Sequence, residues 1–169
     1  MASELEVTTI RGLSSGADAN KIIVPSGQTL SAPGHVIQIV NTGTANQIST
    51  TSTSDVDTGV SLNITPKFTT SKLWLLFSTR LYIDNHSCEY FVNIKNGSTI
   101  IGGGATLFNG SSGDRIAETC NIQGFHSPNS TSQLNYKITH RVSAGTGQIM
   151  PNSHPFDTLL NFAILEIAQ

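Results

Sequence analysis

Two segments of this sequence are apolar on both faces of an extended strand, and they constrain the fold more than any other feature. They are Lys72–Ile83 and the final run Leu159–Ala168. In a sandwich of two sheets, the partner sheet buries only one face of each strand. The second face needs other cover, because a monomer seldom exposes a large apolar patch. The candidate residues for the core or for an interface between copies are Trp74, Leu76, Tyr82, Leu160, Phe162 and Ile164.

A second copy of the same chain is the cover that we expect. The alternative is that the N-terminal segment folds over the exposed face, but it offers only a handful of apolar side chains. We therefore predict a homo-oligomer.

The low content of charged residues excludes several classes of partner. Only 12% of the 169 residues are charged and the net charge is −2, against about 25% charged residues in an average soluble domain. Such a chain lacks the basic field that duplex DNA or an anionic membrane surface requires. No apolar run reaches the ~18–20 residues of a membrane span. We expect no binding of nucleic acid and no insertion into a membrane.

Short alternating runs separated by turn residues predict an all-β protein. Eight such runs follow one another in roughly 130 residues, which is the number and spacing of an antiparallel jelly-roll sandwich. Asn96-Gly97 is a strong hairpin signal, and Pro66 should end the strand before it. The glycines 102–104 are expected to begin a flexible loop, and to permit a tight bend or a close approach of the backbone. The runs are 36–40, 60–64, 72–83, 90–94, 99–101, 116–125, 134–142 and 159–168.

The first 34 residues differ from the rest and should form a short extended anchor or stem before a head domain at residues 35–169. Turn-forming residues dominate this segment, and its few apolar side chains cannot close a core of their own. It must dock on another surface or remain a mobile arm. The candidate anchor residues are Leu5, Val7, Ile10, Ile22, Ile23 and Val24.

The sequence offers no catalytic or metal-binding motif, and we expect neither an enzyme nor a cofactor. Its five histidines lack the spacing of a ligand set. His140 falls on the apolar face of a predicted strand and should be a hydrogen-bonded core histidine, whereas the other four fall in predicted loops. Cys88 and Cys120 are expected to be buried free thiols. The run 55–59 resembles part of a calcium loop but lacks the downstream glutamate.

Loops rich in Asn and Ser could hold a sugar through their planar hydrogen-bonding groups, although any soluble β-sandwich uses the same residues for its turns. The candidate residues for contact with a surface polysaccharide are Asn85, His86, Asn109 and Asn129.

Five short segments follow one another along the chain: Gly34–Val40, Ile64–Pro66 with Ser71–Leu73, Val92–Ser98, Gly124–Pro128 with Asn135–Ile138, and Leu165–Ala168. In this order they resemble segments of structural proteins of tailed bacteriophages. The resemblance covers about residues 34–169, and the stretch 21–30 is similar to linkers that precede such heads.

This resemblance implies a trimeric jelly-roll head like those of complement and tumour-necrosis-factor proteins. It implies a virion protein that is assembled in the bacterial cytoplasm, with a short tail fibre or tail tip as the expected location. The near absence of a shaft before the head leaves a capsid decoration protein, held by its N-terminal segment, as the alternative. A polysaccharide-degrading tail enzyme would need a carboxylate pair, and the eleven acidic residues are mostly isolated.

Overall fold

The computed structural model describes residues 32–44, 46–84, 88–108, 116–149 and 160–169, with isolated positions nearer the N-terminus. The chain divides into two units, Met1–Ser31 and Ala32–Gln169. The border that we predicted, after residue 34, falls three residues from this division. Five of the six candidate anchor residues lie outside the described residues, and the sixth, Val24, is 42% exposed. The anchor role of this segment stays a prediction.

The second unit contains ten strands. They are β1 (Val36–Thr44), β2 (Ile48–Thr50), β3 (Val56–Ile64), β4 (Lys72–Ile83), β5 (Cys88–Asn96), β6 (Thr99–Phe108), β7 (Ile116–His126), β8 (Leu134–Val142), β9 (Gly147–Ile149) and β10 (Leu160–Ile167).

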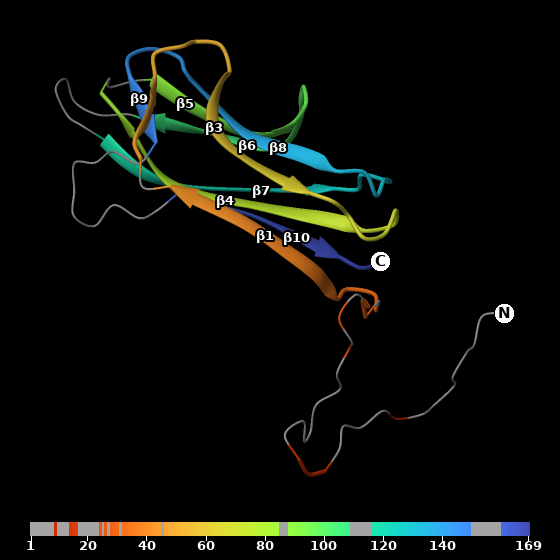
Figure 1. Ribbon diagram of the computed structural model, residues 1–169. Coiled ribbons are helices and arrows are strands. Elements are labelled where there is room, and N and C mark those ends of the chain that lie inside the picture. The colour runs from red at the N-terminus through yellow and green to blue at the C-terminus, as the bar shows by residue number, and fades with distance from the viewer. Residues whose placement is uncertain are drawn as a thin grey trace. The chain divides into compact units, whose positions relative to one another are not determined.

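These strands form two antiparallel sheets that face each other as a sandwich (Figure 1). One edge of β4 pairs along its length with β7, while the other edge pairs first with β10 and then with the short β9. The six-stranded sheet is completed by β1 beside β10 and by β2 beside β9. The four-stranded sheet has the order β3-β8-β5-β6. The chain crosses repeatedly between the two sheets, which confirms the predicted antiparallel jelly-roll sandwich.

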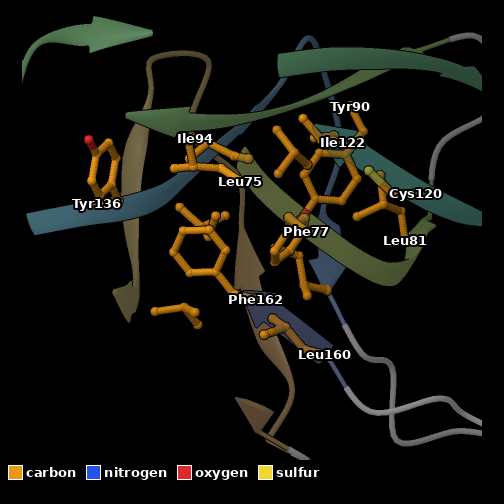
Figure 2. Packing of buried hydrophobic residues seen from close by; sticks show 14 of the residues in the cluster. Leu75, Phe77, Leu81, Tyr90, Ile94, Cys120, Ile122, Tyr136, Leu160 and Phe162 are labelled. Atoms are coloured by element: carbon orange, nitrogen blue, oxygen red, sulfur yellow. The ribbon is translucent and has the colours of Figure 1, made fainter. Parts of the chain in front are cut away.

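The core lies between the sheets and is built from one face of each strand (Figure 2). From the six-stranded sheet, Leu75 and Phe77 of β4 meet Phe162 of β10, and the rings of Phe77 and Phe162 pack edge to face. From the four-stranded sheet, Tyr90 and Tyr136 are fully buried. The alternation predicted for β4 and β10 is confirmed, because every second side chain of these strands enters this core.

The glycine triplet is part of strand β6, so the loop predicted to begin at residue 102 is wrong. Its glycines serve a close approach between the edges of the two sheets, as the second part of that prediction proposed. A Cβ on Gly102 would lie 2.5 Å from the carbonyl oxygen of Gln123, and one on Gly124 would lie 2.5 Å from that of Ile101. Only glycine allows β6 and β7 to approach this closely.

Candidate functional site

The outward side of the six-stranded sheet carries a continuous apolar row that crosses four neighbouring strands. Backbone pairing places Ile39 of β1 beside Leu165 of β10, Leu165 beside Trp74 of β4, and Trp74 beside Phe125 of β7. Ile39 and Phe125, at the two ends of the row, are 60% and 58% exposed, although both are large apolar residues. We call these four residues the apolar row, and the outward side of β1, β10, β4 and β7 the outer face.

Two aromatic side chains of the apolar row stack on each other. The ring centroids of Trp74 and Phe125 are 5.7 Å apart and their planes differ by 14°. The indole N–H of Trp74 donates a hydrogen bond of 3.3 Å to Oε1 of Gln123, which is two residues from Phe125 on the same face of β7. The row therefore presents a flat aromatic surface whose only polar hydrogen is already engaged by a neighbour on the sheet.

Beside the apolar row the outer face is hollowed. The hollow has a volume of about 480 Å³ and lies over β10, β4 and β7. Its apolar lining comes from Leu76 and Ala163, which are paired across β4 and β10, and from Phe77 and Ile122. The other outward side chains that line it are uncharged and polar: Ser78, Asn121, Gln123 and Asn161.

The outer face carries no charged side chain over its central part, as far as the described residues extend. Along β4 the outward charges are Lys72 at the start and Arg80 near the end. Between them, the outward positions of β10 and β7 are occupied by apolar, amide or hydroxyl side chains. A protein surface of this extent without charge resembles the buried centre of an interface more than a surface in contact with water.

The outward side of the four-stranded sheet has the opposite character. Asp55 forms ion pairs with Lys95 and with Arg141, whose Nε lies 3.3 Å from Oδ1. The guanidinium of Arg141 lies 3.5 Å from the centre of the Phe91 ring, a cation–π contact. Asp57 pairs with Lys137 at 3.1 Å. Asp55 and Asp57, which the sequence placed in a partial calcium loop, are thus paired with Lys and Arg side chains. The charged groups make this face suited to contact with water.

The six residues predicted for the core or the interface separate onto two sides of the sheet. Leu160, Phe162 and Ile164 are fully buried between the sheets, so they belong to the core. Trp74 and Leu76 are half-buried and point outward, and Tyr82 is 8% exposed where β4 meets β9.

Sequence reasoning missed other members of the outer face. Leu165, Ala163 and Phe125 were not among the candidates, although the alternation of β10 already places Leu165 and Ala163 opposite to Phe162. Phe125 had no such signal, because its strand is only weakly patterned.

A buried carboxylate connects the last strand of the head domain to the first strand and to the loop before β4 by hydrogen bonds. Glu166 of β10 is fully buried and follows the inward alternation of its strand. Its Oε1 accepts hydrogen bonds from the hydroxyl of Ser71 at 2.6 Å and from the backbone N–H of Lys67 at 2.7 Å. The side-chain amide of Gln38 donates to Oε2. The last strand, the first strand and the loop between β3 and β4 therefore meet at one side chain.

His140 is the hydrogen-bonded core histidine that the sequence predicts. It is 1% exposed, and its Nδ1 lies 2.8 Å from the hydroxyl of Tyr90. Burial lowers the pKa of His140 to about 4, against the opposite influence of the carboxylates of Asp55 and Asp57. Burial also raises the pKa of the Tyr90 hydroxyl well above its ordinary value. Both groups are therefore neutral near neutral pH.

The predictions for the remaining histidines and for the cysteines have mixed outcomes. His126 does not lie in a loop but ends β7, where its Nδ1 is hydrogen-bonded to the hydroxyl of Tyr136, and burial lowers its pKa. His35 is exposed. Cys88 and Cys120 are buried free thiols, as predicted, and burial raises the pKa of Cys120 to about 11.

Of the candidate sugar-binding residues, Asn129 alone lies in the described part of the chain. It is exposed in the loop between β7 and β8, with a φ of 51°. Asn85, His86 and Asn109 lie outside the described residues.

The described residues contain neither a cluster of side chains suited to a metal ion nor a helix suited to a membrane. Within them, no group of three or more His, Cys, Asp or Glu side chains is placed to hold a metal ion. Over the same part of the chain, no helix is long and apolar enough to cross a membrane.

Comparison with known proteins reveals likeness at the level of the fold. The sequence matches no family model and no curated protein. A chain in the structure of infectious bursal disease virus Gt strain has 13% identity and a TM-score of 0.43 over 88% of this chain and 42% of its own. A chain of the infectious bursal disease virus VP2 subviral particle has 11% identity and a TM-score of 0.39 over 88% and 42%.

A further similarity covers nearly the whole of both chains. It is to the VLP of the extra small virus of the giant freshwater prawn Macrobrachium rosenbergii, with 14% identity and a TM-score of 0.21 over 96% of this chain and 97% of the other. By contrast, this chain spans less than half the length of the bursal disease virus chains. At these identities and TM-scores the likeness concerns the arrangement of strands alone.

Proposed function

We propose that this protein is a structural component of a virus particle and assembles as a homotrimer through its outer face. In the proposal, the head domain forms the trimer, and the N-terminal segment attaches it to another virion protein. The resemblance of residues 34–169 to bacteriophage structural proteins supports the virion part. The role is one of architecture rather than of catalysis.

While the number of three copies follows from the resemblance alone, the observation that carries assembly through the outer face is the contrast between the two outward sheet faces. One is apolar and uncharged from Ile39 to Phe125, and the other is covered by the ion pairs around Asp55. Four strands about 4.8 Å apart and about ten residues long give an outer face of roughly 600 Å². This approaches the ~800 Å² that each partner contributes to a stable interface. A second copy is the occupant that we propose, because the described residues in the central part of this face, between Lys72 and Arg80, carry no charge.

Light scattering of the purified full chain tests the trimer. At 18.0 kDa per chain, a trimer has a mass of about 54 kDa. Leu165→Asp places a charge at the centre of the apolar row and should yield folded chains of 18 kDa, because an unpaired charge in an interface is costly. Ile100→Asp is the matched control, since Ile100 is 55% exposed on β6, outside the outer face. A wild-type protein with the mass of one chain would refute the proposal.

The location in the particle separates two forms of the proposal. A capsid decoration protein predicts many copies per particle, whereas a tail fibre or tail tip predicts a few trimers. The tail location rests on the sequence resemblance alone, so both locations are to be tested on equal terms. Quantitative mass spectrometry of purified virions measures the copy number.

Attachment through the N-terminal segment has its own test. A truncation that starts at Gly34 removes the predicted anchor and leaves every strand of the sandwich. We expect this truncated chain to form trimers but to be missing from assembled particles. A truncated chain that joins particles normally would contradict the anchor role. Contact of the trimer with host polysaccharide is a separate proposal, for which Asn129 is the candidate residue to substitute.

A further inference from the structure

The hollow in the outer face requires an occupant if this face is covered by a copy of the chain. Its volume of about 480 Å³ is larger than any single apolar side chain and it opens on the outer face. A flat partner would leave it empty, and an unfilled apolar void inside an interface forfeits contact energy. The partner must therefore project a side chain at this position.

Phe125 is the side chain on this chain that best meets the requirement. It is the largest of the exposed apolar residues in the described part of the chain, at 58% exposure. It projects from the same outer face, and its own strand contributes Asn121 and Gln123 to the hollow. Its stacking on Trp74 fixes one side of the ring, so little conformational freedom remains to be lost on binding. A rigid aromatic anchor of this kind is typical of the residues that dominate binding energy.

The lining of the hollow suits an aromatic ring. Leu76 and Ala163 offer apolar contact, while the amide groups of Asn121 and Gln123 can place N–H groups against a ring face. Neither Lys72 nor Arg80 of β4 lines the hollow, so a ring that enters the hollow does not have to displace water from a charged group.

We infer that Phe125 of each copy inserts into the hollow beside Leu76 and Ala163 of the next copy. This inference rests on the proposed function, which it deepens by naming the contact that holds the copies together. Because every chain carries both the ring and the hollow, successive insertions can close a ring of chains.

A pair of complementary substitutions in the full chain tests this contact. Phe125→Ala removes the ring, and Ala163→Phe fills the hollow from within the same chain. Each should raise the dissociation constant of the assembly by about 30-fold, as expected for a dominant interface residue. The double variant should recover most of this loss, because a filled hollow then faces a partner that projects nothing. Ile100→Ala, another exposed apolar truncation, should leave the dissociation constant unchanged.

The readouts are the molar mass by light scattering as a function of concentration and the far-ultraviolet circular dichroism of each variant. Leu76→Trp fills the same hollow from β4 and should act as Ala163→Phe does, should the latter fail to fold. A wild-type chain that is a monomer at every concentration would overturn the proposed function. A wild-type oligomer that is insensitive to the single variants, or whose double variant shows only additive losses, would overturn this inference alone.

Discussion

The hydroxyl of Ser71 donates a 2.6 Å hydrogen bond to Oε1 of Glu166, a carboxylate with no exposed surface. The same oxygen accepts the backbone N–H of Lys67, and the other oxygen accepts the amide of Gln38. A buried carboxylate is costly unless it is hydrogen-bonded, and this one accepts hydrogen bonds from two other segments, the loop before β4 and strand β1. These bonds hold the loop before β4 against the last strand, and so fix the entry of β4 into the outer face.

Glu166→Ala should destabilise the head domain strongly. It leaves the buried hydroxyl of Ser71 without its acceptor and removes the acceptor of the Lys67 N–H, at an expected cost of about 3 kcal/mol in the free energy of unfolding. Glu166→Gln retains one acceptor oxygen and should cost less. Urea denaturation measures both variants, and Glu118→Ala, at an exposed position, serves as control. A Glu166→Ala variant as stable as that control would contradict the role of this carboxylate.

Acid should destabilise the fold through His140. Its pKa is lowered to about 4 in the folded chain, against about 6.5 in the unfolded chain. Between these values the unfolded state binds more protons, so stability is fully present above pH 6.5 and declines as the pH falls toward 4. The loss is at most about 1.4 kcal/mol per pH unit. His126, whose pKa is also lowered, contributes in the same direction.

The measurement is the free energy of unfolding of wild type and of His140→Gln from pH 7 to pH 4. The variant should be less stable at pH 7, because it disturbs the hydrogen bond to Tyr90, but it should lose less stability on acidification. Parallel curves for the two proteins would show that His140 does not titrate as described.

Alanine substitutions at two glycines test whether glycine is required by the close approach of two strands or only by backbone flexibility. Gly124→Ala introduces a Cβ 2.5 Å from the carbonyl oxygen of Ile101 and should cost about 2 kcal/mol or more, since the backbone itself must shift. Gly104→Ala meets only Cγ1 of Ile122, at 3.9 Å, and should change stability by less than about 1 kcal/mol. Thermal unfolding compares the two. Equal melting temperatures would contradict the account of how β6 and β7 meet.

The layout of the sandwich could be predicted because the alternation of apolar and polar residues along a strand indicates which of its side chains are buried. Lys72–Ile83 and Leu134–Val142 are strands with the predicted bounds, and the apolar residues on one face of each strand enter the core, while Trp74 and Leu76 point outward. The hairpin at Asn96-Gly97 also forms, with Gly97 at a φ of 58°. These features depend on local pattern and turn chemistry, which a sequence displays directly.

Other features depend on residues that are distant in the sequence, so a local stretch of sequence does not predict them. Strands β2 and β9, of three residues each, are too short to show a period. The glycines of β6 resemble a loop until the approach of Gly124 is known. Glu166 is an exception, since continuing the alternation of Phe162 and Ile164 already places it on the buried side. Phe125 became a candidate only when pairing placed it beside Trp74.

Trp74 is the only tryptophan of the chain and lies within the apolar row, so its fluorescence reports directly on whether another copy covers the outer face. The decisive measurement is the quenching of this fluorescence by acrylamide while the full chain is diluted and its molar mass is followed. We predict weak quenching at the mass of the assembly, with a several-fold increase as the mass falls to that of one chain. Strong quenching at every concentration, at the mass of a single chain, would contradict the central claim that copies of the protein cover this face.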